Sequence, residues 1–315
     1  MNAFEVLAPG GFTTVQDKGR FGFQQMGVPV CGVLDTFSCN TANLLVGNDI
    51  NRAVLEITIM GPSLKFLSCM DIAVTGAKME MTLNNRPTEQ WRSIRVKPGD
   101  VLTISQVQAG CRACLAVTGG IKVPPVMGSC STYAGGGFGG FMGRSLQAGD
   151  ILDAHKSPLL TRDRVVPEEL IPDYPSHVLL RAVPGPQDDF FDQGAATLFT
   201  SQYMVTPKAD RMGYRLQGEK ISIKPGMPKS IVSEPSMPGG IQIPADEQPI
   251  ILLVEQTVGG YAKIATVIST DIPKVAQATP GDTISFERID LKTAHQIFHD
   301  EKKKLTQILA RMQRQ

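Results

Sequence analysis

The sequence predicts a mostly β fold made of two β-barrels, with short helices between strands and a longer helix at the C-terminus. Short runs of aliphatic and β-branched residues follow one another closely along the N-terminal half, and turn residues separate them. The 315 residues include 22 prolines and 31 glycines, which indicates many turns. Closely spaced strands of this kind favour a barrel or sandwich over a parallel α/β sheet.

An internal repeat indicates that the two barrels are related. A Gly-Asp turn before a strand-like run occurs three times, at residues 98–102, 148–152 and 280–284. The apolar run 111–117 leads into a Gly pair at 119–120, just as the run 250–254 leads into a Gly pair at 259–260. The chain is also long enough for two cores, because single cores usually stop growing at roughly 250–300 residues.

The proline-rich and charged segment 157–176 is the natural linker, since such a composition buries little surface. We therefore expect a first barrel over residues 1–170, a second over 177–290 and an amphipathic helix over 291–315. In that helix, apolar side chains recur at helical spacing. They are Ala294, Ile297, Phe298, Leu305, Ile308, Leu309 and Met312.

In the first barrel, two short strands flank the Pro-Gly-Gly turn at 9–11 and are expected to form a hairpin. Asp35 is a natural N-cap for a helix over 36–46. Further strands are expected around residues 54–59, 64–66, 72–75, 80–83, 93–96, 101–105 and 111–117. In the second barrel, helices are expected at 188–199 and directly after Asp271, with Pro273 in the first turn. Strands are expected at residues 179–183, 241–243 and 250–254.

Composition argues against several classes of protein. Lys and Arg number 31 and Asp and Glu 30, so the net charge of +1 gives no electrostatic reason to expect nucleic acid or an anionic membrane as partner. No apolar run is long enough for a transmembrane helix, and the N-terminus lacks a signal-peptide pattern. The six cysteines lack the paired spacing of a zinc site, and we expect buried free thiols in a cytoplasmic protein.

Polar residues end two predicted strands in the stretch 233–263. The aliphatic run 250–254 is typical of a strand buried on both faces, and it leads directly into Glu255 and Gln256. Gln242 stands between two isoleucines and is expected to project outward as an amide. Glycine pairs lie beside both strands and allow a close approach of the backbone. We expect these strand ends to form one wall of a site.

A second polar group follows the first two strands. Gln16, Asp17 and Arg20 are either a turn with a surface ion pair, which contributes little stability, or an amide, a carboxylate and a guanidinium that face a substrate. Spacing alone favours the turn. Arg211 and Arg215 are either surface arginines or a fork that binds a carboxylate or phosphate.

Three patterns resemble cofactor motifs but lack a necessary part. Lys78 follows alanine rather than standing between two methionines, so covalent biotin is not expected on this chain. The glycine-rich segment 135–144 has no Gly-Lys-Ser/Thr ending and is not a phosphate cradle. His295 and His299 have the spacing of a metal pair without a third ligand, so no metal site is expected.

Motifs spread along the chain give a resemblance to a known family. They occupy residues 14–20, 27–29, 34–35, 42–48, 55–56, 128–132, 210–213 and 256–261. In these residues the chain resembles the biotin-dependent carboxyltransferase family, which includes allophanate hydrolase subunit 2-like proteins and the C subunit of 5-oxoprolinase. The resemblance extends to about residue 289 and implies that both domains are cyclophilin-like β-barrels.

The resemblance also implies an enzyme subunit that is active only in a complex. In the oxoprolinase system, an A-type and a B-type subunit join it, and ATP-dependent opening of 5-oxo-L-proline gives L-glutamate. ATP would be bound in the complex, because this chain offers no self-sufficient ATP site. One alternative is transfer of CO2 from carboxybiotin on a partner chain to a urea-like or other small acceptor. Another is a non-enzymatic antagonist that binds a kinase-inhibitor partner.

Roles follow for the residues that match family motifs. Asp17 is the first candidate base, Glu255 the second, and Tyr261 a donor; such groups assist the opening of a lactam. The expected substrate-binding residues are Gln16, Arg20, Asp35, Ser131, Arg211, Gln242 and Gln256. The sequence departs from the family pattern at Cys130 and Glu255, where arginines are expected, and this leaves the substrate open.

Overall fold

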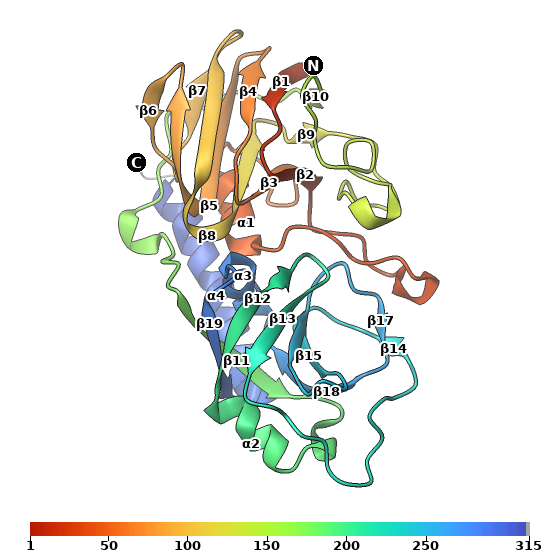
Figure 1. Cartoon of the computed structure of the whole chain (residues 1–315). Coiled ribbons are helices and arrows are strands. Elements are labelled where there is room, and N and C mark those ends of the chain that lie inside the picture. Colours follow the sequence, from red (N-terminus) through yellow and green to blue (C-terminus); the bar gives the residue numbers. More distant parts are fainter. Residues whose placement is uncertain (313–315) are drawn as a thin grey trace. The chain divides into compact units, whose positions relative to one another are not determined.

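The structure is a computed structural model that describes residues 1–312. Residues 313–315, and the side chains of Leu309 and Met312 that we assigned to the apolar face of the C-terminal helix, lie outside the described part. The chain divides into two compact units. The first comprises Met1–Arg20, Cys31–Tyr174 and Lys304–Gln315, and the second Phe21–Val30 and Pro175–Lys303. Each unit is built around a strongly curved β-sheet (Figure 1), so the predicted mostly β fold with two barrels is confirmed.

The first unit holds a ten-stranded sheet. Its strands are β1 (Asn2–Ala8), β2 (Phe12–Gln16), β3 (Val54–Thr58), β4 (Ser63–Phe66), β5 (Met70–Leu83), β6 (Arg86–Thr88), β7 (Ile94–Val96), β8 (Val101–Val117), β9 (Ile121–Lys122) and β10 (Ile151–Ala154). The main path runs β2-β3-β8-β4-β1-β10-β9, and β5 pairs with β6, β7 and β8. Short 3-10 turns lie at Ala134–Gly136 and Glu168–Leu170.

Two features of this sheet differ from expectation. The strands at 72–75 and 80–83 are one strand, β5, and those at 101–105 and 111–117 are one strand, β8. The pairing of β5 with β8 is irregular around Lys78, and these irregularities accommodate the polar residues that suggested a break in each strand. In addition, β1 and β2 flank the predicted turn but do not form a hairpin, because β1 pairs with β4 and β10 while β2 pairs with β3.

Apolar side chains of β1, β3, β4, β5 and β8 fill the first core, where Phe4 and Phe66 meet edge to face with ring centroids 6.1 Å apart. Helix α1 (Thr36–Leu45) packs against the outside of β5 and β8. The predicted cap is confirmed: the Asp35 carboxylate accepts hydrogen bonds from the Ser38 backbone N–H at 2.9 Å and from its hydroxyl at 2.6 Å.

The cysteine prediction is wrong in part. Cys39 of α1 and Cys114 of β8 form a disulfide, because helix and strand pack closely enough to bring the two together. Cys69 is exposed, while Cys31 and Cys111 are buried and take no part in a disulfide.

The second unit is a closed barrel in the order β11-β18-β15-β16-β13-β12-β19. Its strands are β11 (His177–Pro184), β12 (Gln202–Ala209), β13 (Gly213–Gly218), β15 (Gly240–Ile243), β16 (Ile250–Leu252), β18 (Ala262–Val267) and β19 (Thr283–Arg288). A separate ribbon pairs β14 (Glu234–Pro235) with β17 (Val258–Gly259). 3-10 turns lie at Gln24–Met26, Asp188–Phe190 and Ser269–Asp271, and the helices are α2 (Gln193–Thr200) and α3 (Ile272–Gln277).

The predicted helix at 188–199 is therefore a 3-10 turn followed by α2. Asp271 precedes α3, but its side chain does not cap the helix. Its carboxylate instead accepts hydrogen bonds from the backbone and guanidinium of Arg181. Burial by itself would raise the pKa of Asp271, but these bonds and the charge of Lys274 outweigh it and lower the pKa.

Helix α4 (Leu291–Met312) confirms the C-terminal helix. Ile308 is buried in the second apolar cluster of the first unit, beside Trp91 and residues of α1. Within residues 1–312, no helix is long and apolar enough to cross a membrane.

Candidate functional site

Asp17 is the centre of a buried polar cluster in the first unit. It directly follows β2, and its Oδ1 accepts hydrogen bonds from the hydroxyls of Ser129 and Ser131, both at 2.6 Å. The backbone N–H of Gly19 donates to the same oxygen at 2.9 Å, and that of Cys130 donates to Oδ2 at 2.6 Å. These four hydrogen bonds hold the loop after β2 against the segment 129–131.

Arg20 lies in the same cluster and is 1% exposed. Its Nη2 donates to the backbone oxygen of Ser131, and its guanidinium lies over the ring of Phe138, 5.1 Å from the centroid. Its Nε and Nη1 have no hydrogen-bond partner among the described residues. A buried cation with unused donors is costly, so these two N–H groups mark a place where an acceptor would be bound strongly.

The glycine-rich segment contributes to this cluster through Gly139. Its φ is +72°, and a Cβ at this position would stand 2.2 Å from the Ser131 backbone oxygen and 2.6 Å from Nη2 of Arg20. Only glycine allows the backbone to approach the arginine so closely. The segment is recognisable in the sequence as glycine-rich, but Phe138 and Gly139 are not recognisable there as neighbours of Arg20, because no local pattern links positions so far apart.

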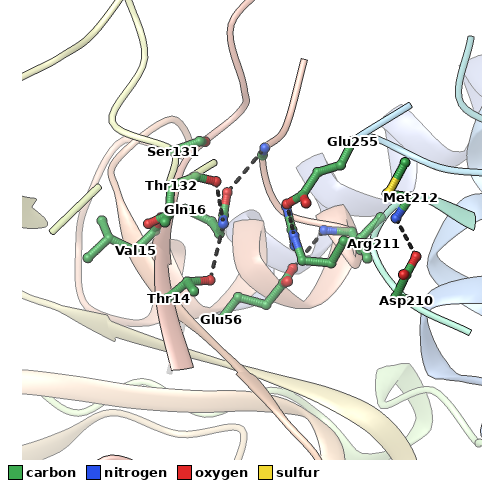
Figure 2. Close-up of polar contacts among 12 residues, drawn as sticks. Thr14, Val15, Gln16, Glu56, Ser131, Thr132, Asp210, Arg211, Met212 and Glu255 are labelled. Atoms are coloured by element: carbon green, nitrogen blue, oxygen red, sulfur yellow. Dashed lines mark hydrogen bonds and ion pairs between the residues drawn. The ribbon is translucent and has the colours of Figure 1, made fainter. Parts of the chain in front are cut away.

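Gln16 fixes the surroundings of the cluster. Its Nε2 donates to the Thr14 hydroxyl at 3.1 Å and to the Thr132 backbone oxygen at 3.2 Å, while its Oε1 accepts from the Gly32 backbone N–H at 3.2 Å. Figure 2 shows the amide between Thr14 and Thr132. With both ends of the amide occupied, Gln16 holds the backbone around Asp17 in place.

Cys130 lies between Ser129 and Ser131 and is half-buried. Burial is the main cause that raises the pKa of its thiol, and the charge of Asp17 adds to it. A thiol kept protonated in this way is a poor nucleophile. The site therefore offers donors and a fixed carboxylate rather than a reactive thiolate.

The structure brings together four of the predicted residues of the first unit: Gln16, Asp17, Arg20 and Ser131. Asp35 serves as the cap of α1, with each of its carboxylate oxygens bonded to Ser38. Ser129 was not among the predicted residues, although its place beside Ser131 in the motif 128–132 was a usable signal.

In the second unit, Arg211 and Glu255 form an ion pair. The Arg211 Nε lies 2.5 Å from the Glu255 Oε1, and the two side chains are 6% and 11% exposed. Backbone bonds join the same segments: the Leu253 N–H donates to the Met212 oxygen and that of Glu255 to the Arg211 oxygen. The arginine that we expected to bind an anion and the carboxylate that we expected as a second base are thus paired with each other (Figure 2).

The other predicted residues of the second unit differ in burial. Gln242 of β15 is 3% exposed, and its Nε2 has no hydrogen-bond partner among the described residues. Gln256 donates to the Val258 backbone oxygen at 2.6 Å, within its own turn. Tyr261 is 41% exposed. Of these three, only Gln242 carries a buried donor that is available to a ligand.

Known proteins are similar to this chain over most of its length. Residues 26–288 match the family model described as carboxyltransferase domain, subdomain A and B. The chain is 39% identical to the C subunit of 5-oxoprolinase from Escherichia coli K12, over 98% of both chains. It is 34% identical to the protein of the same name from Haemophilus influenzae, over 92% of both.

Larger fungal enzymes are similar over one part of their length. Urea amidolyase of Lachancea kluyveri is 35% identical over 94% of this chain but only 17% of its own. The crystal structure of Kluyveromyces lactis urea amidolyase superposes with a TM-score of 0.91 at 35% identity, covering 97% of this chain and 20% of that one.

Proposed function

Because the chain belongs to the carboxyltransferase-domain family that includes the C subunit of E. coli 5-oxoprolinase, we propose that it is the C subunit of an ATP-dependent 5-oxoprolinase complex. In this proposal it opens 5-oxo-L-proline to L-glutamate together with an A-type and a B-type subunit. The match over 98% of both chains carries the proposal, since it leaves no domain of the relative unaccounted for.

The cluster around Arg20 supports a role in lactam chemistry. Opening a lactam places negative charge on the carbonyl oxygen, and buried donors aimed at that oxygen stabilise the charge. The Nε and Nη1 of Arg20 are such donors, already desolvated and held by Ser131 and Phe138. Asp17, with four donors on its carboxylate, is better suited to position this arginine loop than to accept a proton.

ATP is assigned to the complex rather than to this chain. The glycine-rich segment 135–144 packs around Arg20 and Thr132 instead of forming an open phosphate loop. Covalent biotin is not assigned to this chain either, because Lys78 lies within the long strand β5 and not at a hairpin tip.

The test is 5-oxo-L-proline-dependent ATP hydrolysis by the chain co-expressed with its A-type and B-type neighbours. We expect activity only with all chains present, and a loss of about 100-fold in kcat for Arg20→Lys, which keeps the charge but loses the fork of donors. The control is Lys18→Ala, an exposed lysine of the same loop, which should retain full activity. Turnover by the chain alone, or full activity of Arg20→Lys, would contradict the proposal.

The similarity to urea amidolyase favours one second candidate, transfer of CO2 from carboxybiotin on a partner chain to a urea-like acceptor. In that case avidin would abolish activity of the complex, because it sequesters biotin. Avidin-resistant, 5-oxo-L-proline-dependent ATP hydrolysis would exclude this candidate.

A further inference from the structure

A buried group of polar side chains lies in the second barrel where the β14–β17 ribbon meets β15 and β18. Gln242 of β15 and Lys263 of β18 are direct cross-strand partners, so their side chains leave the same face of the sheet. Gln242 alternates with Ile241 and Ile243, both fully buried, which places the amide on the opposite face from theirs. Lys263 is 5% exposed.

Two donors in this group have no hydrogen-bond partner among the described residues: Nε2 of Gln242 and the hydroxyl of Ser236. Both side chains are at least 97% buried. They lie close together, since a Cβ on Gly259 would stand 2.1 Å from Nε2 of Gln242 and 3.1 Å from Oγ of Ser236. Native proteins rarely bury such groups unpaired, so the pair indicates a missing acceptor.

The third donor, the Lys263 ammonium, is held by Glu234 of the ribbon. The side chain of Glu234 is 41% exposed, whereas that of Lys263 is 7% exposed, so the lysine is fixed and the carboxylate is free to turn into solvent. Gln187 steadies the pair: its Nε2 donates to Glu234 at 3.2 Å and its Oε1 accepts from the Lys263 backbone N–H at 3.0 Å.

We propose that Lys263, Gln242 and Ser236 form a binding site for the carboxylate of a small ligand, and that the Glu234 carboxylate occupies the place of that group until the ligand displaces it. Three converging donors match an acceptor with two oxygens and a negative charge. The position of Glu234 shows that a carboxylate fits against Lys263. The ribbon, joined by backbone bonds such as Ser236 N–H to Thr257 oxygen at 2.9 Å, then covers the bound group.

The choice of first ligand rests on the proposed function, because 5-oxo-L-proline carries a carboxylate beside its lactam. The site itself does not rest on it, since any small carboxylate of suitable shape tests the same donors. Binding is therefore measured by calorimetry on the co-purified complex with 5-oxo-L-proline, L-glutamate and malonate. The neutral lactam 2-pyrrolidinone is the matched ligand without a carboxylate.

The variants separate this site from a structural ion pair. Lys263→Met should weaken carboxylate binding at least tenfold and leave binding of 2-pyrrolidinone unchanged. Glu234→Gln should tighten carboxylate binding several-fold, because it removes the competing charge while keeping the bond to Gln187. Lys220→Met, an exposed lysine of the same unit, is the control and should behave as wild type.

A carboxylate that binds equally to wild type and Lys263→Met, a weaker affinity in Glu234→Gln, or no binding of any carboxylate probe would overturn the inference. Failure of the proposed function is separate: a complex without oxoprolinase turnover that still binds L-glutamate or malonate through Lys263 retains this site. Conversely, turnover with an unchanged KM in Lys263→Met would leave the proposed function intact and remove the site.

Discussion

Asp17 and Glu234 are both carboxylates beside a buried cation or donor cluster, yet their surroundings differ sharply. Asp17 is 9% exposed and accepts four hydrogen bonds, two of them from serine hydroxyls. Glu234 is 41% exposed at its side chain and contacts one lysine and one amide. The first is enclosed by its partners on every side, whereas the second has solvent as an alternative to its protein partners.

The two carboxylates also differ in where the unpaired donors beside them lie in the chain. Beside Asp17, the unpaired groups are on Arg20, whose position depends on the loop that Asp17 holds. Beside Glu234, one unpaired group is on Gln242 of the neighbouring strand β15 and the other is on Ser236, two residues along the chain from the carboxylate. We therefore infer that Asp17 holds the loop of Arg20 in position, whereas Glu234 can be displaced by a ligand. Substitutions of Asp17 should cost more stability than substitutions of Glu234.

The largest effect is expected for Asp17→Asn. The NH2 group of asparagine would replace one accepting oxygen and would face the N–H or O–H groups that now donate to it, so several buried groups would lose their partner. We expect this to lower the free energy of unfolding by about 3–5 kcal/mol. Urea unfolding monitored by circular dichroism measures this cost. Ser129→Ala and Ser131→Ala each remove one of the donors and should cost about 1–2 kcal/mol, so they remain measurable if the first variant does not fold. A cost below about 1 kcal/mol for Asp17→Asn would remove the distinction from Glu234.

A smaller effect is expected for Gly139→Ala. Its Cβ would stand 2.2 Å from the Ser131 oxygen, and its φ of +72° is unfavourable for alanine, so we expect a loss of about 2–3 kcal/mol. Gly137→Ala is the matched control, since its φ is +69° but a Cβ there would meet nothing within 4 Å. It should cost only about 1 kcal/mol, the backbone part alone. Equal losses in the two variants would mean that Arg20 and Ser131 are not held as closely as the structure has them.

Much of the fold follows from local sequence patterns. The capping residue Asp35 and the turns around Gly-Asp pairs were correctly predicted because their physical cause lies within a few residues. The continuity of β5 and β8 was missed, because pairing along their whole length outweighs the polar residues that suggest a break. The partners of β1 and β2 were also missed, since strand pairing over long sequence separations leaves no local signal.

The polar residues divide in a similar way. Asp17 and Arg20 stand out in the sequence as polar residues after a strand. Their hydrogen-bond partners in 129–131, which define their roles, lie more than a hundred positions away in the sequence. The pairing of Arg211 with Glu255 likewise depends on the adjacency of two chain segments. Lys263 was not identified as a site residue at all, because a single lysine in a strand carries no signal until its cross-strand partner is known.

The smallest effect is expected for the stability of Glu234→Gln. The hydrogen bond from Lys263 lowers the pKa of Glu234, so the carboxylate contributes stability above its ordinary pKa of 4.5, and this contribution disappears as the pH falls through the lowered value. Because the side chain is half exposed and glutamine keeps an acceptor oxygen, the loss at pH 7 should be about 1 kcal/mol or less. Urea unfolding of wild type and variant at pH 7, 5, 4 and 3 should show this difference shrinking toward the acid end. A loss as large as that of Asp17→Asn, or a difference that grows on acidification, would mean that Glu234 is as firmly held as Asp17 and is not displaced by a ligand.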